Sequence, residues 1–222
     1  MAISKSTIDF LKTIRENNNK PWFEANKDLY LAAKDDFKNF AEDLRSLMDK
    51  HDHLEKHKIF RIYRDVRFSK DKTPYKSNMS LGFTRATKAL RGGYYLHVEP
   101  NNIFAGGGFW GPESKDLKRI RDEFAASDKE IRSIISRPEF IKYFGELKGD
   151  EVKTAPRGYD KEHPAIDLIR KKQFVVMRSF TQKDVLSKNF AEEVNNTFKA
   201  MRPFFDYMSD VLTTNINGES II

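Results

Sequence analysis

Hydrophobic side chains recur with two different periods along this chain, and the change of period restricts the fold to the α+β class. In residues 7–15 and 21–50, apolar residues lie three or four positions apart, as on one face of a helix. From residue 60 to residue 106, apolar and polar residues alternate instead, as in strands with one buried face. We therefore expect a mostly antiparallel sheet of about five strands with helices packed on it, in a single domain over residues 1–222.

Turn and helix-breaking residues set the limits of the expected elements. The patterns predict strands at residues 60–68, 79–83, 94–99, 103–106 and 173–180. Helices are predicted at residues 7–15, 21–50 and 163–172, in a region 114–144 broken near residues 127 and 137, and at 189–212. Pro203 is expected to kink or divide the last helix, because proline removes one hydrogen bond and clashes with the preceding turn.

The absence of cysteine excludes disulfides, thiolate catalysis and cysteine-based metal sites. The longest uninterrupted apolar runs, such as residues 174–177, are far shorter than the roughly 20 residues that cross a bilayer. The first residues lead into an amphipathic segment rather than an apolar signal sequence. We expect a cytoplasmic protein with no membrane partner.

Most of the excess positive charge lies in one segment. The formal net charge is +7, and residues 56–76 hold eight basic residues against two acidic ones, a local balance of +6. Such a segment creates a local field that attracts phosphates, carboxylates or nucleic acid. Anionic small molecules and nucleic acid are therefore the candidate partners, while the sequence identifies no cofactor and leaves the oligomeric state open.

Arginine and lysine in this segment form a candidate anion site. On the predicted strand at 60–68, alternation places Arg61, Asp65 and Arg67 on one face, and the following turn brings further charges near the strand end. Arginine offers bidentate donors to phosphate and carboxylate, and lysine adds a point charge. The candidate anion-binding residues are Arg61, Arg64, Arg67, Lys72, Lys76 and, from a later loop, Arg157. The alternative is a salt-bridge lattice in which the protein's own acids neutralise these cations.

Arg64 is unusual because alternation places it on the apolar face of the predicted strand. A charge there must be paired or must line a cavity, unless a β-bulge turns the side chain outward. Asp65 or Asp71 could act as a general base or could orient an arginine.

Four short motifs stand out along the chain: Asn18 with Trp22 and Phe23, the segment 61–76, the run 106–110 and the loop 156–159. Together they resemble the family called domain of unknown function 2461, and the resemblance covers most of the chain. It implies a one-domain architecture, and the segment 61–76 is its most distinctive motif. The resemblance supplies no roles for the motifs, which follow only from the chemistry of their side chains.

The glycine run 106–108 and the loop 156–160 are weaker signals for a pocket. The run leads to a helix start and could cradle an anion, but Glu113 and Asp116 would repel one there, so a β-bulge or a tight strand exit is favoured. The loop is either a second binding element or a turn with its tyrosine packed on the core. The candidate pocket-lining residues are Tyr75, Gly107, Trp110 and Tyr159, with Trp110 as a possible lid.

Histidines suggest a metal site only superficially. His51, His53 and His57 have a spacing seen in metal ligands, but they lie at a helix end among lysines, which oppose a bound cation. We expect no metal site. His97 and His163 are isolated in the sequence and are expected to be structural.

The leading functional hypothesis is an anion- or phosphate-binding site on the sheet, in a protein that could be an enzyme for a small phosphorylated or carboxylated substrate. One alternative is a nucleic-acid-binding module in which Tyr63, Tyr75 or Trp110 stacks on bases. Another is a protein-interaction domain, which a large exposed apolar patch would favour. A concave pocket favours the first hypothesis, and an extended basic surface favours the second.

Overall fold

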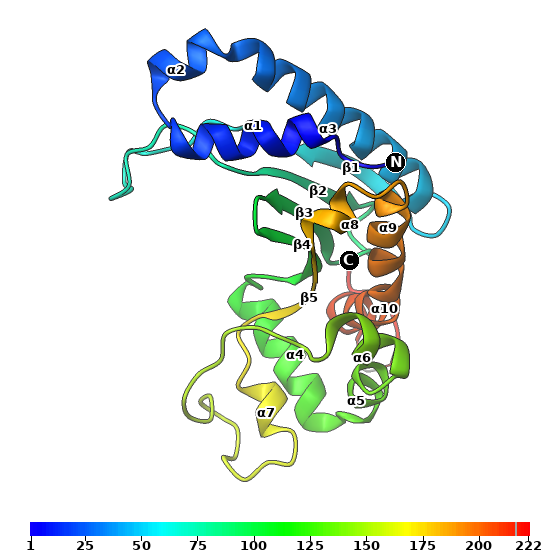
Figure 1. Cartoon of the computed structure of the whole chain (residues 1–222). Coiled ribbons are helices and arrows are strands. Elements are labelled where there is room, and N and C mark those ends of the chain that lie inside the picture. Colours follow the sequence, from blue (N-terminus) through cyan, green and yellow to red (C-terminus); the bar gives the residue numbers. More distant parts are fainter. Residues whose placement is uncertain (216) are drawn as a thin grey trace. The chain divides into compact units, whose positions relative to one another are not determined.

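A computed structural model describes residues 1–215 and 217–222 and shows a five-stranded antiparallel sheet combined with helices, which confirms the α+β class (Figure 1). The strands follow each other across the sheet in the order β1-β2-β3-β4-β5. Their bounds are β1 Leu54–Ile59, β2 Met79–Arg85, β3 Gly93–Glu99, β4 Asn102–Phe109 and β5 Phe174–Phe180. The helices are α1 Lys5–Glu16, α2 Lys20–Ala25, α3 Lys27–Met48, α4 Ser114–Ala126, α5 Lys129–Ile135, α6 Pro138–Phe144, α7 Ile166–Ile169, α8 Gln182–Val185, α9 Phe190–Ala200 and α10 Arg202–Thr213.

The chain divides into two compact units, and residues of both belong to the sheet. The first unit comprises Met1–Phe83, Tyr95–Ala105 and Ser179–Asn196, and the second comprises Thr84–Tyr94, Gly106–Arg178 and Thr197–Ile222. Each unit is described by itself below. The expectation of a single domain stays a prediction. Within the described part of the chain, no helix combines the length and the apolar character needed to cross a membrane.

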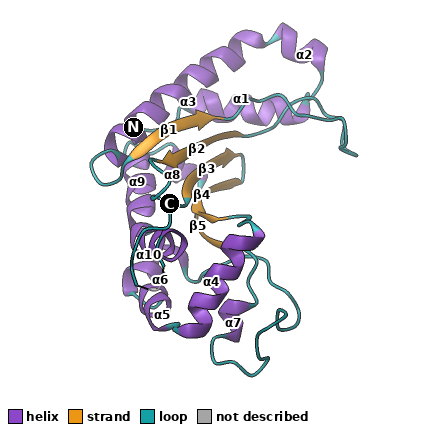
Figure 2. Cartoon of the chain, turned by 180° about the vertical axis from the view of Figure 1, so that it is seen from behind, coloured by secondary structure: helices purple, strands orange, loops and turns teal. Residues whose placement is uncertain are grey.

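In the first unit, α1 packs on α3, and α3 lies alongside β1 (Figures 1 and 2). The side chain of Ser4 caps α1 by accepting a hydrogen bond from the backbone N–H of Thr7. The single helix predicted over residues 21–50 is divided at Asn26, whose side-chain amide donates to the carbonyl of Trp22 at 2.9 Å. Asparagine competes in this way with the helical backbone, and so α2 ends there.

The strand predicted at residues 60–68 is wrong, because β1 ends at Ile59 and the chain then leaves the sheet. Residues 60–76, here called the basic arm, fold back on themselves through an isolated antiparallel bridge between Tyr63 and Tyr75. Ile62 and Phe68, which were expected on the same buried face, differ in exposure: Ile62 is 3% exposed and Phe68 is 97% exposed. Alternation alone does not provide a neighbouring strand to pair with.

In the second unit, the predicted helix breaks are confirmed. The region 114–144 divides into α4, α5 and α6 near residues 127 and 137. Pro203 lies in the first turn of α10 and separates that helix from α9. Beneath α10, the guanidinium of Arg85 is fully buried and donates to Asp206 Oδ1 at 2.6 Å.

Strand β3 shows how the sheet presents side chains within the first unit. Leu96 and Val98 are fully buried in the core. The alternate residues Tyr95, His97 and Glu99 are only partly buried and point to the other side of the strand, which we call the outer face. This face therefore brings three polar side chains of one strand together.

Candidate functional site

Arg64 is paired within the basic arm, although the strand on whose apolar face it was expected does not form. Its guanidinium donates to the carboxylate of Asp71 and to the hydroxyl of Thr73. The hydroxyl of Ser69 lies 3.4 Å from the same guanidinium. Arg64 thus fixes the turn of the arm, and its charge is already matched.

Two further candidate anion ligands also have partners inside the arm. Arg67 forms two parallel hydrogen bonds with Asp65, at 2.9 Å from Nε and 2.6 Å from Nη2. The ammonium of Lys72 donates to the carbonyl of Val66 at 3.0 Å. Arg67 therefore follows the internal salt-bridge alternative, whereas Lys72 is held by a backbone carbonyl and not by a carboxylate.

The two acids of the arm orient arginines. The side-chain hydrogen bond from Arg67 lowers the pKa of Asp65. A backbone hydrogen bond from Thr73, followed by the side chains of Arg64 and Thr73, lowers the pKa of Asp71 to about 2. A general base at neutral pH works best with a pKa near that pH. Both carboxylates are therefore better suited to holding cations than to accepting protons.

Lys58, Arg61 and Lys76, here called the cation cluster, are different. In the described part of the chain, none of the three makes an ion pair with a carboxylate within 4.0 Å. The ammonium groups of Lys58 and Lys76 lie 5.3 and 5.8 Å from the centre of the Phe60 ring. Burial, then the charges of Arg61 and Lys58, lower the pKa of Lys76. The three cations thus act on one another through their charges.

A hollow of about 240 Å³ is lined by Arg61 of the cation cluster, whereas Lys58 and Lys76 are not among its lining residues. Tyr30 and Lys34 of α3 contribute to its wall, and Arg61 and Asn78 contribute from the chain that follows β1 and precedes β2. Hydroxyl, amide and cationic groups are all donors that an anionic oxygen can use. The hollow therefore has the chemistry of an anion site, and it belongs wholly to the first unit.

The outer face of β3 carries a hydrogen-bonded row of ionisable groups. The Tyr95 hydroxyl lies 3.2 Å from His97 Nδ1, and His97 Nε2 lies 3.4 Å from Glu99 Oε2. The hydroxyl of Ser77 donates to Glu99 Oε1 at 2.6 Å. Phe104 stacks on the His97 ring with centroids 5.0 Å apart. We call Tyr95, His97 and Glu99 the polar row.

Electrostatics set the charge states within the polar row. Burial is the largest effect on His97 and lowers its pKa, and the charge of Lys76 lowers it further. The hydrogen bond to Glu99 and the charge of Glu99 raise the pKa, but the net shift is downward. Burial raises the pKa of Glu99, but hydrogen bonds, mainly from Ser77 and His97, lower it by more. The pKa of Glu99 is therefore below its usual value. His97 is therefore neutral and Glu99 ionised near pH 7. The influence of Lys76 on His97 connects the polar row with the cation cluster.

Sequence reasoning missed the polar row by treating His97 as an isolated residue. The signal was present, because Tyr95, His97 and Glu99 alternate along a strand whose other residues are apolar. A period of two places all three on the same face. Their mutual hydrogen bonds could not be read from the spacing.

Tyr75, a candidate pocket residue, anchors the base of the basic arm. It is 4% exposed and stacks on Phe23 with ring centroids 4.0 Å apart. The side-chain amide of Asn18 donates to the Tyr75 carbonyl at 2.8 Å, and its oxygen accepts the Tyr75 N–H at 3.0 Å. This contact joins the motif near the N-terminus to the basic motif. Tyr75 is not accessible for stacking on a base.

The remaining candidates belong to the second unit, so they are described apart from the cation cluster. Arg157 and Tyr159 line a hollow of about 360 Å³, and the Tyr159 hydroxyl donates to Asp122 Oδ1 at 2.8 Å. Trp110 is 59% exposed. Gly107 lies inside β4, where a Cβ atom would come within 2.8 Å of Phe205 Cζ, so this glycine permits close packing.

The histidines near residue 50 have neighbours other than each other. His51 Nε2 lies 2.9 Å from the Asn195 oxygen, and His57 Nε2 lies 3.6 Å from Glu42 Oε1. Across residues 1–215 and 217–222, no three histidine, aspartate or glutamate side chains converge as a metal site would require.

Comparison with known proteins identifies a family. The model of the family described as conserved hypothetical protein (DUF2461) matches residues 6–207 of the 222-residue chain. The chain therefore belongs to this family, which confirms the assignment made from the four motifs. No curated protein and no solved structure matches the chain.

Proposed function

We propose that this member of the DUF2461 family binds a small phosphorylated or carboxylated molecule in its first unit, with the anionic group held by the cation cluster. The observation that carries the proposal is the effect of the charges of Lys58 and Arg61 on Lys76, together with a hollow that Arg61 lines. Of the six residues predicted to bind an anion, Arg61 and Lys76 are retained as the direct ligands, and Lys58 is added to them.

Charge balance supports this choice. Arg64 and Arg67 each have an aspartate within hydrogen-bond reach, so a guest anion would have to displace a protein carboxylate. The cation cluster carries mutual repulsion instead, which an anion would relieve. Lys76 is partly buried, which strengthens its attraction for an anion because charges interact more strongly where less water screens them. An anion is therefore favoured at the cluster over the tip of the arm.

The polar row supplies proton-transfer chemistry, and the charge of Lys76 acts on its central residue, His97. With Nε2–H donating to Glu99, the neutral His97 presents Nδ1 as an acceptor for the Tyr95 O–H. Tyr95 can then accept a proton from a bound molecule while its own proton passes to His97 Nδ1. This arrangement is what an enzyme acting on a small anionic substrate requires.

Calorimetric titration with inorganic phosphate tests the binding proposal. We expect saturable binding at low salt that weakens in 0.5 M NaCl, because screening reduces the attraction of exposed charges. The variant Arg61→Met/Lys76→Met should lose binding. The variant Arg67→Met/Lys72→Met removes the same charge from the arm and should retain it. Equal loss in both double variants would show that only the overall field attracts phosphate.

The proton arrangement has its own test. Long-range ¹H–¹⁵N correlation spectra distinguish the two neutral tautomers of His97. We expect the proton on Nε2. A neutral ring protonated on Nδ1 would contradict the proposed role of Tyr95, while leaving the anion-binding proposal intact.

A second function, binding of single-stranded nucleic acid, is favoured by one observation. Phe68 is 97% exposed at the tip of the basic arm, between Arg67 and Lys70. An exposed aromatic ring between cations can stack on a base while the cations contact phosphates. Retention of a single-stranded oligonucleotide at low salt, reduced by Phe68→Ala, would support this function. No retention at any salt concentration would dismiss it.

A further inference from the structure

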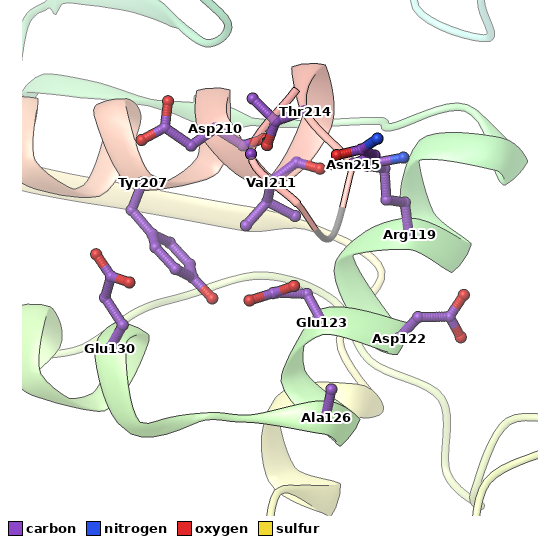
Figure 3. Close-up of a pocket in the computed structure, with 11 residues that line it drawn as sticks. Arg119, Asp122, Glu123, Ala126, Glu130, Tyr207, Asp210, Val211, Thr214 and Asn215 are labelled. Atoms are coloured by element: carbon purple, nitrogen blue, oxygen red, sulfur yellow. Dashed lines mark hydrogen bonds between the residues drawn. The ribbon is translucent and has the colours of Figure 1, made fainter. Parts of the chain in front are cut away.

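A second hollow, in the second unit, has the opposite charge. It measures about 640 Å³ and is lined by residues of α4, α5 and α10 together with the chain after α10 (Figure 3). Figure 3 shows Glu123, Glu130 and Asp210 around it, with Tyr207 between them. All of these residues belong to the second unit.

The carboxylates around this hollow exceed the cations. Its lining contains four acids and one base, a formal balance of −3. The base is Arg119, whose Nε donates to the carbonyl of Val211. Asp122 is paired with Lys118 at 2.6 Å. In the part of the chain that the structure describes, Glu123, Glu130 and Asp210 have no ion pair within 4.0 Å.

Tyr207 gives an independent indication of a ligand. The residue is 6% exposed, and its hydroxyl oxygen has no hydrogen-bond partner among the described residues. In Figure 3 the hydroxyl is directed into the space between Glu123 and Glu130. Burial, then the charges of Glu123 and Glu130, raise the pKa of Tyr207, so its hydroxyl stays protonated. A buried hydroxyl without a partner is unusual in a folded protein.

We propose that this hollow binds an organic cation with more than one amino group, such as a linear alkyl polyamine. An ammonium group offers only N–H donors, and the lining offers carboxylate oxygens and the Tyr207 oxygen as acceptors. The phenol ring can also face the cation. The proposal does not depend on anion binding in the first unit.

The spacing of the acids distinguishes this ligand from a metal ion. A divalent cation needs several oxygen ligands within about 2.6 Å of one point. Among the described residues, no three acidic or histidine side chains converge in this way. The acids instead come from separate helices around a volume large enough for an extended molecule. Charges spread along a polyamine match acids that are spread along a hollow.

The site is compatible with the positive charge of the whole chain. The formal net charge of +7 comes from residues outside the hollow. Salt weakens the effect of charges that lie farther away than the Debye length, which is about 8 Å at physiological ionic strength. Within the hollow the nearest charges are carboxylates, and they determine the local potential. A cation that enters the hollow is therefore attracted.

Calorimetric titration with spermidine tests the proposal on the full chain at low salt. We expect saturable 1:1 binding, and at least tenfold weaker binding to Glu123→Gln/Glu130→Gln. The matched control is Glu139→Gln/Glu146→Gln, which removes two exposed acids that are not part of the hollow. This control should bind as the unmodified chain does. No saturable binding, or equal weakening in both double variants, would overturn the proposal.

Tyr207→Phe provides a second variant with a distinguishing readout. Removing a buried hydroxyl that has no partner should leave the thermal stability of the free protein unchanged or raised, while weakening spermidine binding severalfold. Unchanged spermidine binding would refute the role of Tyr207. A parallel titration with MgCl₂ should give no 1:1 site of comparable affinity, and a tighter magnesium site would overturn the choice of an organic cation.

Discussion

The fully buried guanidinium of Arg85 provides the most quantitative prediction for the fold. It donates to Asp206 Oδ1 at 2.6 Å and to the carbonyl of Arg91 at 3.0 Å, and Ser209 Oγ lies 3.4 Å away. The side chain of Asp206 is 46% exposed, whereas that of Arg85 is 0% exposed. Asp206→Asn removes the negative charge and leaves the buried positive charge in place.

The expected loss of stability follows from this burial. Removing one partner of a buried ion pair costs about 3–5 kcal/mol, because the charge that stays in the interior loses the attraction of that partner. Water around the half-exposed Asp206 places the expected value near the lower end of that range. For a chain of this size, 1 kcal/mol shifts the melting temperature by about 2–4 °C, so we expect a decrease of about 6–12 °C.

Thermal unfolding followed by circular dichroism measures this effect. The double variant Arg85→Met/Asp206→Asn should be more stable than Asp206→Asn alone, because it no longer buries a guanidinium that has lost the Asp206 carboxylate. Such non-additivity is expected for residues in direct contact. A decrease below about 2 °C in Asp206→Asn, or a double variant that is less stable than both single variants, would refute the reasoning.

Four further predictions concern single residues. Gly107→Ala should destabilise the chain by about 1–3 kcal/mol in urea unfolding, because the added methyl group overlaps buried atoms; an unchanged midpoint would contradict the close packing. Burial lowers the pKa of His97 in the folded chain below the ordinary value of 6.5. Between these two values the unfolded chain binds more protons than the folded chain, so stability should fall as the pH is lowered from 6.5 to the folded-state pKa. Glu99→Gln should lower the NMR-measured pKa of His97 further, and a rise would contradict the hydrogen bond. The carboxyl carbon of Asp71 should titrate at about pH 2 in ¹³C NMR, and a midpoint near 3.8 would mean that Arg64 and Thr73 do not hold it in solution.

Local patterns were sufficient for much of the fold. Periodicity and helix breakers predicted the sheet, the divisions of the region 114–144 and the separation of α9 from α10 at Pro203. These features depend on residues close in sequence, where hydrogen-bonding rules are strict. They are therefore visible without knowledge of tertiary contacts.

The basic arm shows where local patterns fail. Its alternation is as regular as that of a strand, yet the segment pairs with itself and is anchored by contacts of Tyr75 with Phe23 and Asn18. Conversely, β1 is rich in charged residues and was not predicted. Whether an alternating segment joins a sheet depends on which partner strand lies beside it, and that is a long-range property.

The sequence indicated the basic segment as the candidate site, but it did not distinguish the cations that are paired with acids from those that are not. Counting charges identified the basic segment, whereas the pairing of Arg64 with Asp71 and of Arg67 with Asp65 required coordinates. Among the cations that these pairs leave over, Lys58, Arg61 and Lys76 are distinguished by the effect of their charges on Lys76 and by the hollow that Arg61 lines. His97 enters the site only because the sheet brings it near Lys76.

Diffraction from crystals soaked in sodium selenate tests the central claim most directly, because selenate has the shape and charge of sulfate and resembles phosphate, and selenium is located by its anomalous scattering. We expect a selenium peak within hydrogen-bond reach of Arg61 and Lys76, and its loss in crystals of Arg61→Met/Lys76→Met. Selenate bound only at Arg67 or Lys72, or a cation cluster without a peak at saturating selenate, would contradict the claim that the unmatched cations form the anion site.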